Sequence, residues 1–153
     1  MTVRRILAAT ATATATAAAL ALTLTACGSG EPSVSVSEGP VAESTPAAGE
    51  QVPLEQFAAA LKLPGTTIVD VRTPAEYADG HLPGAMNIDL QGADFLQQVS
   101  ALDPTAPYAV YCRSGNRSAV AVDQMTQLGF TSAYDLAGGY VDWEQAGGET
   151  VTG

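Results

Sequence analysis

The sequence predicts an α/β fold with a mostly parallel central sheet and helices on both of its faces. Short apolar runs, typical of buried strands, alternate along the chain with segments whose apolar residues recur at helical spacing. Strands that alternate with helices imply right-handed crossovers, and therefore a parallel sheet between two helical layers. The 153 residues have room for one such domain once the ends are set aside.

Folded structure is predicted to begin with a helix near Pro53. Leu54, Phe57 and Leu61 fall at helical spacing. Pro53 suits a first helical turn, and Gly65 follows the end of the pattern. The predicted domain covers 53–150.

Two short strands and two helical segments are predicted next. Residues 67–71 form a nearly continuous apolar run, typical of a buried parallel strand. Residues 74–78 indicate one helical turn, and residues 85–88 a second short strand. Apolar residues at helical spacing predict another helix over 95–102.

The second half of the domain is organised around Cys112. A strand over 108–111 ends directly before this cysteine, and a helix is predicted over 118–128. A further strand over 133–136 and a last short helix over 140–145 follow. Because sites in parallel sheets lie at the carboxyl ends of the strands, Cys112 stands where a site is expected.

The stretch after the strand is predicted to bind an anion. Small or polar residues let the backbone turn tightly, and Gly115 can take a positive φ. Successive N–H groups, together with those of the following helix, form an anion-binding nest. Arg113 and Arg117 add positive charge, so Cys112 is expected to be a reactive thiolate rather than an inert buried cysteine.

The N-terminus resembles an export signal. Arg4 and Arg5 precede an uncharged, apolar and Thr-rich run, which is the layout of a secretory signal peptide over 1–26. Residues 24–27, Leu-Thr-Ala-Cys, resemble the lipobox of bacterial lipoproteins, which implies lipidation of Cys27. The alternative is a plain cleavage signal followed by an unmodified cysteine, and the export route, Sec or Tat, stays open. Lipidation would anchor the protein on the extracytoplasmic face of a bacterial membrane.

Residues 27–52 are predicted to be the lipid-bearing cysteine and a flexible linker, because they hold no aromatic residue, Leu or Ile. The net charge of −10 argues against nucleic acid and against electrostatic binding to anionic lipid. If Cys27 carries lipid, Cys112 is the one remaining thiol and no internal disulfide can form. We expect no metal site, since the chain has one histidine and no Cys/His cluster. We also expect a monomer and no cofactor.

Two spaced motifs stand out in the predicted domain: 70–77 with its continuation 80–87, and 112–118 with the downstream 136–140 and Trp143. Together they resemble signatures of single-domain rhodaneses, a family of sulfurtransferases. The likeness covers roughly 53–148, and two motifs in the right order are far less accidental than either alone. The resemblance implies a rhodanese-like three-layer fold.

The resemblance also implies site residues and a reaction. Cys112 would carry the transferred sulfur as a persulfide, in two half-reactions. The implied substrates are a small anionic sulfur donor such as thiosulfate, and an acceptor that is cyanide in assays and a thiol in cells. The residues expected to bind them are Arg113, Ser114, Gly115, Asn116, Arg117 and Ser118.

Four residues of the first motif are expected to support the site. Asp70, Arg72 and Glu76 are assigned to the rim, although Arg72 and Glu76 also have the spacing of an i,i+4 pair. His81 is expected to be a structural hydrogen-bonding residue.

Three rival functions remain beside the sulfurtransferase. Dual-specificity phosphatases of the same fold have five residues between Cys and Arg, whereas this chain has four, 113–116, and Tyr111 where they have His. The second rival is a non-enzymatic lipoprotein that carries sulfur or binds a partner. The resemblance implies that an intact Cys112 argues against a purely inactive scaffold, but a sulfur carrier would keep this cysteine as well. In a redox sensor, an oxidant would convert Cys112 to sulfenic acid, and if Cys27 carries lipid no second free thiol in the chain would resolve it.

Overall fold

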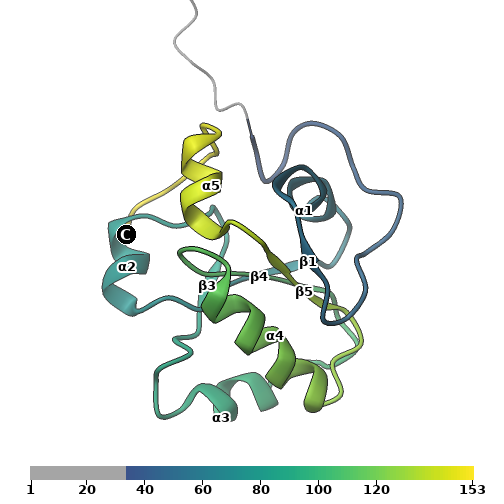
Figure 1. The fold of residues 1–153 in the computed structure, drawn as a ribbon, viewed down its shortest axis with the longest axis vertical. Helices are drawn as coiled ribbons and strands as arrows, with labels where there is room; N and C mark the ends of the chain where they lie inside the picture. Colours follow the sequence, from purple (N-terminus) through teal and green to yellow (C-terminus); the bar gives the residue numbers. More distant parts are fainter. Residues whose placement is uncertain (1–33) are drawn as a thin grey trace, which may run out of the picture.

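The computed structural model describes residues 34–153, in which strands and helices alternate (Figure 1). The strands are β1 (Gln51–Val52), β2 (Thr67–Asp70), β3 (Met86–Asn87), β4 (Tyr108–Tyr111) and β5 (Ala133–Leu136). The helices are α1 (Leu54–Ala60), α2 (Pro74–Asp79), α3 (Phe95–Ser100), α4 (Asn116–Gln127) and α5 (Gly139–Gln145). Each helix and strand that the sequence predicts is present.

The sheet is parallel, with the strand order β1-β5-β4-β2-β3. Asp70 of β2 pairs with Tyr111 of β4 and with Asn87 of β3, so these three strands end level with one another. Cys112 follows at this carboxyl edge. The predicted parallel α/β fold is confirmed.

The two faces of the sheet bury different helices because successive strand residues point to opposite sides. In β4, Ala109 and Tyr111 join a buried cluster with apolar side chains of α1 and α5. Val110, and Cys112 just beyond the strand, join a second cluster with side chains of α3 and α4. Figure 1 shows the same two helical layers around the sheet. Cys112 therefore lies on the α4 face.

The N-terminal boundary differs from the prediction of a flexible linker through residue 52. Val52 is fully buried in β1, which pairs with β5. Val34, Val36 and Ala42 pack against the cluster beneath α1 and α5. The linker prediction is wrong for 34–52, because a few small apolar side chains with no periodic pattern can still pack on a surface that the rest of the domain has formed.

The C-terminal boundary also moves slightly beyond the predicted residue 150. His81 and Val151 exchange two backbone hydrogen bonds of 2.9 Å each, which closes an antiparallel bridge. The signal peptide predicted over 1–26 and the lipidation predicted at Cys27 lie outside the described residues. Within 34–153, no helix has the length and apolar character needed to cross a bilayer.

Candidate active site

Cys112 lies directly after β4, beneath the turn that leads into α4. Its side chain is only 1% exposed and belongs to the apolar cluster under α3 and α4. Arg113, Ser114 and Asn116 are exposed above it. The sulfur therefore lies beneath the loop and is almost fully buried.

Two glycines allow the loop to approach its neighbours closely. Gly115 has a φ of 85°, and a Cβ at this position would overlap the carbonyl oxygen of Ala137. Gly139 has a φ of 62°, and a Cβ at this position would overlap the backbone of Cys112 and Arg113. The loop is thus fixed between the first turn of α4 and the start of α5.

The hydrogen bonds of the loop leave its amides free. Tyr140 N–H donates to the Cys112 carbonyl at 2.7 Å, and Val141 N–H donates to the Arg113 carbonyl at 3.1 Å. Among residues 34–153, none accepts a hydrogen bond from the N–H groups of 113–118. Free amides at the N-terminus of a 12-residue helix favour a negative charge, in agreement with the predicted anion site.

Arg117 is held by a carboxylate from the first motif. Its Nη1 and Nη2 donate to Oε2 and Oε1 of Glu76 at 2.8 and 2.7 Å. Thr73 fixes Glu76 in turn, because its N–H donates to Oε2 at 3.1 Å in the capping box of α2. The Arg117 hydrogen bonds lower the pKa of Glu76 to about 2.

This ion pair gives the two arginines of the loop different surroundings. The positive charge of Arg117 is matched by Glu76, whereas Arg113 has no carboxylate within ion-pair distance among the described residues. The sequence assigns both arginines to the substrate, so Arg113 is the one whose charge stays unmatched. The alternative pair of Arg72 with Glu76 is not formed, since each has a different partner.

A second, buried ion pair supports the rim from below. Arg72 Nε donates to Asp70 Oδ1 at 3.0 Å, and Nη2 donates to Oδ2 at 2.6 Å and to the Gly80 carbonyl at 2.5 Å. The guanidinium carbon lies 4.1 Å from the centroid of the Tyr140 ring. Since Arg72 and Asp70 are 2% and 0% exposed, their contacts are those of a structural pair.

His81 makes local contacts as a hydrogen-bonding residue. Its Nδ1 lies 2.9 Å from the Tyr77 carbonyl, and its ring stacks on the Tyr77 ring with centroids 3.6 Å apart. Its backbone pairs with Val151. Within 34–153, no three His, Cys, Asp or Glu side chains are grouped so that they could hold a metal ion.

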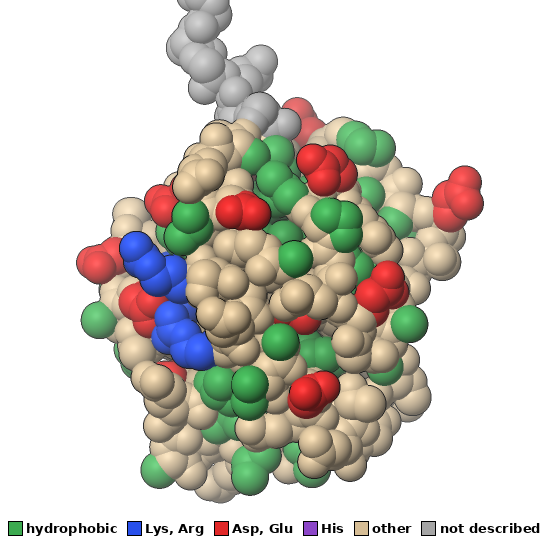
Figure 2. Space-filling view, viewed as in Figure 1, with side chains coloured by type: hydrophobic (Ala, Val, Ile, Leu, Met, Phe, Trp, Pro, Cys, Tyr) green, Lys and Arg blue, Asp and Glu red, His purple; other side chains and the backbone are tan. Residues whose placement is uncertain are grey.

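A small hollow of about 170 Å³ adjoins the loop. Its lining residues are Arg72, Glu76, Asp79, Gly80, Arg113, Tyr140 and Glu144. Basic side chains gather beside acidic ones at the α2 edge in Figure 2, while acidic groups are spread over the rest of that face. The hollow therefore mixes both signs of charge.

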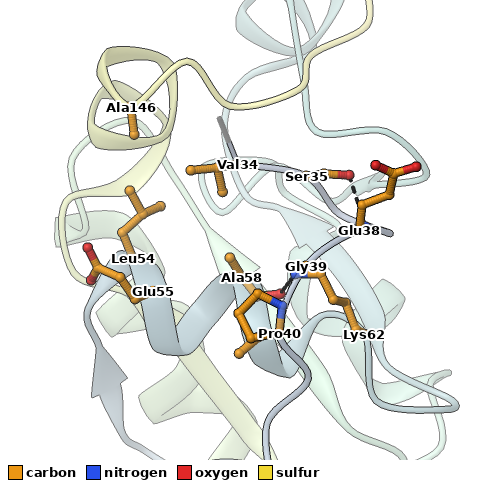
Figure 3. A pocket seen from close by; sticks show the side chains of 11 residues that line it. Val34, Ser35, Glu38, Gly39, Pro40, Leu54, Glu55, Ala58, Lys62 and Ala146 are labelled. Carbon is orange, nitrogen blue, oxygen red and sulfur yellow. Dashed lines mark hydrogen bonds between the residues drawn. The ribbon is translucent and has the colours of Figure 1, made fainter. Parts of the chain in front are cut away.

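A larger hollow of about 260 Å³ lies elsewhere, between the N-terminal segment and α1 (Figure 3). Val34 and Pro40 line one side, and Leu54, Ala58 and Lys62 line the other. None of the predicted site residues borders it. The smaller hollow, lined by Arg113, is the one next to the Cys112 loop.

One buried acid near Cys112 is missed by the sequence reasoning. Asp135, in β5, is 1% exposed, and its Oδ2 accepts hydrogen bonds from Ser118 Oγ at 2.8 Å and Gln51 Nε2 at 3.0 Å. Ser118 Oγ also lies 3.5 Å from Cys112 Sγ. Burial raises the pKa of Asp135. The available signal was an acid inside a short strand whose other residues are apolar.

The comparisons with known proteins agree with this geometry. The sequence profile of the family described as "Rhodanese-like domain" matches residues 53–146. Thiosulfate sulfurtransferase GlpE of Pseudomonas entomophila (strain L48) is 38% identical over 98 residues, covering 63% of this chain and 87% of that protein. Thiosulfate sulfurtransferase 16, chloroplastic, of Arabidopsis thaliana is 39% identical over 97 residues, covering 57% of this chain and 81% of that protein.

Solved structures give the same assignment. A rhodanese-related protein from Thermoplasma volcanium superposes with a TM-score of 0.60 at 30% identity, over 67% of this chain and 97% of that one. The rhodanese-like domain of the Anabaena protein Alr3790 superposes with a TM-score of 0.61 at 30% identity, over 67% and 78% of the two chains. The family match, the parallel sheet and the cysteine loop together show that this chain belongs to the rhodanese-like domain family.

Proposed function

We propose that this protein is a sulfurtransferase that moves a sulfane sulfur from thiosulfate, or a related donor, to a nucleophilic acceptor through a persulfide on Cys112. The observation that carries the proposal is the position of Cys112 directly before the free amides of 113–118 at the start of α4. The curated relatives named above as thiosulfate sulfurtransferases support the same reaction class.

The first half-reaction is a thiolate displacement. Cys112 Sγ attacks the terminal sulfur of the donor, the bond between that sulfur and the sulfonyl sulfur breaks, and sulfite leaves with the bonding electrons. The enzyme keeps the sulfane sulfur as a persulfide. Both the thiolate and the persulfide are anions, so fixed N–H donors of the loop stabilise each of them without reorganisation.

The second half-reaction regenerates the cysteine. A nucleophilic acceptor, cyanide in an assay or a thiol in the cell, attacks the outer sulfur of the persulfide, and Cys112 departs as the thiolate. Because donor and acceptor react in separate steps at one residue, we expect ping-pong kinetics. A single cysteine is sufficient for this cycle.

The burial of Cys112 favours a compact donor. Arg113 supplies the unmatched positive charge that attracts an anion to the hollow, and Asp79 and Glu144 on the same lining oppose it. With Cys112 only 1% exposed, the donor must present a terminal sulfur at the end of a narrow group. Thiosulfate has that shape.

Turnover of thiosulfate and cyanide tests the proposal. The protein should form thiocyanate and sulfite, and a Cys112→Ser variant should form neither above the uncatalysed rate. A variant that turns over as fast as the parent would overturn the assignment. Stoichiometric sulfur uptake on Cys112 with no turnover for any acceptor would instead identify the sulfur carrier.

We also propose that Cys27 bears the lipid that anchors the domain to a membrane. The support is the lipobox-like sequence at 24–27 after an uncharged apolar run. In cells given radiolabelled fatty acid, the full-length chain should be labelled and a Cys27→Ala variant should not. Equal labelling of the two proteins would contradict the anchor.

A further inference from the structure

Three polar side chains form a continuous chain inside the α4 face of the domain. Ser118 Oγ lies 3.5 Å from Cys112 Sγ and 2.8 Å from Asp135 Oδ2. Cys112, Ser118 and Asp135 are 1%, 0% and 1% exposed. Bulk water therefore has little access to any of the three groups.

Two protons shared among Cys112, Ser118 and Asp135 allow two arrangements of hydrogen bonds. In one, the thiol donates to Ser118 Oγ, and the Ser118 hydroxyl donates to an ionised Asp135. In the other, a protonated Asp135 donates to Ser118 Oγ, and Ser118 donates to a Cys112 thiolate. Both carry one negative charge, so the exchange adds no net charge to the buried site.

We propose that Asp135 receives the Cys112 proton through the Ser118 hydroxyl when the thiolate forms, and returns it when the sulfur has left the enzyme. The inference rests on the proposed function for its place in the catalytic cycle. Asp135 does not touch the substrate in this scheme and is therefore a positioning residue. Ser118 is the link between it and the nucleophile.

The transfer balances at every bond. The S–H bond of Cys112 breaks, its proton bonds to Ser118 Oγ, and the former Ser118 proton bonds to Asp135 Oδ2. The electron pair left on Sγ then forms the S–S bond to the sulfane sulfur. When an acceptor removes that sulfur, the two protons move back.

Four further groups lie near Cys112, Ser118 and Asp135, and each has a defined charge or hydrogen bond. Arg117, on α4, carries a positive charge that is matched by Glu76 of α2. Gln51, on β1, is neutral and donates to Asp135 Oδ2 at 3.0 Å. Asp123, exposed on α4, acts on Asp135 only through its charge. The Gly115 carbonyl, 3.1 Å from Ser118 Oγ, competes for the same hydroxyl proton.

The test is the pH dependence of Cys112 reactivity in Asp135→Asn and Ser118→Ala, with Asp123→Asn as the control. Persulfide formation from thiosulfate is measured in a single turnover, and alkylation by iodoacetamide is measured separately. Alkylation needs no sulfur donor, so it reports on the proton relay even if thiosulfate is not a substrate. Circular dichroism establishes that each variant is folded.

The relay predicts a defect that depends on pH. Without an internal acceptor, the thiol must lose its proton to solvent, and this loss becomes easier as the pH rises. Asp135→Asn and Ser118→Ala should each react roughly tenfold more slowly than the parent at about pH 6.5, and within about twofold at about pH 9. Asp123→Asn, which removes a charge that acts on Asp135 only at a distance and takes no part in the relay, should stay within about twofold of the parent at every pH.

The competing explanations give different results. If Asp135 acted only as a nearby negative charge, Asp135→Asn would react faster than the parent at low pH, because a like charge opposes thiolate formation. If its role were structural, the loss would be the same at every pH. Either outcome overturns the proposal, and Ser118→Ala decides it alone should Asp135→Asn fail to fold.

Discussion

Arg117 and Glu76, 41 residues apart in the chain, join the first turn of α4 to the first turn of α2 through a two-point ion pair. The two motifs recognised in the sequence are therefore in direct contact. Glu76 aligns Arg117, and Arg117 in turn fixes the start of α4, whose first N–H groups have no acceptor among residues 34–153. Because the charge of Arg117 is matched by Glu76, Arg113 is the arginine of the loop whose charge can attract an anionic sulfur donor.

Loss of this ion pair should weaken the fold in acid. Because the folded-state pKa of Glu76 is about 2, below its ordinary value of 4.5, its stabilising effect is complete above pH 4.5 and is lost as the pH falls toward 2. Glu76→Gln should lower the free energy of unfolding at neutral pH by about 1 kcal/mol, a value reduced for partial exposure. Urea titrations of both proteins should converge as the pH falls to about 2; a constant difference at all pH values would contradict the ion-pair explanation.

Arg113 should control the affinity for an anionic donor. Arg113→Gln removes the unmatched charge beside the hollow, so the KM for thiosulfate should rise several-fold while the melting temperature stays the same. Arg117→Gln should instead lower the melting temperature, because it leaves Glu76 without its partner. Steady-state kinetics and thermal melts on the two variants distinguish these effects. An unchanged KM in Arg113→Gln would show that its charge does not act on the donor.

Gly115 should tolerate no side chain. Gly115→Ala places a methyl group against the Ala137 carbonyl at a φ of 85°, so the loop must shift. We expect loss of most sulfur-transfer activity and a lower melting temperature. Gly129→Ala is the matched control, since Gly129 also has a positive φ, 92°, but no neighbouring atom close to the added Cβ. Similar losses of activity in the two variants would refute the role of the close approach.

The N-terminal segment should contribute to stability. Val52 is fully buried between β5 and α1, and Val52→Ala should lower the free energy of unfolding by about 1–3 kcal/mol. Val41, which is 58% exposed, provides the control, because Val41→Ala should change it by less than about 0.5 kcal/mol. Chemical denaturation checks both. Equal stability of Val52→Ala and the parent would restore the prediction that this region is a linker.

Most of the fold follows from local sequence. The strands from β2 to β5 carry apolar runs, and the helices carry apolar residues at helical spacing or, in α2, a proline and a capping box that act within a few positions. β1 does not, since its two residues, Gln51 and Val52, form a strand only because β5 offers an edge. Tertiary contact, and not propensity, defines that element.

The site is predicted in part for the same reason. Cys112 and its loop are contiguous, so their chemistry is visible in the sequence. Asp135 lies in a different strand, and its nearness to Ser118 depends on the α4–β5 packing. The pairing of Arg117 with Glu76 is equally non-local, so the nearer Arg72 was the obvious partner in sequence. Tertiary contacts therefore determine which arginine forms the ion pair with Glu76.

Mass spectrometry of the protein after incubation with thiosulfate is the most direct test of the persulfide. The peptide that contains Cys112 should gain the mass of one sulfur atom, and cyanide should remove it with formation of thiocyanate. A Cys112→Ser variant should gain nothing. Absence of the adduct from the parent, or an equal adduct on the variant, would contradict the account.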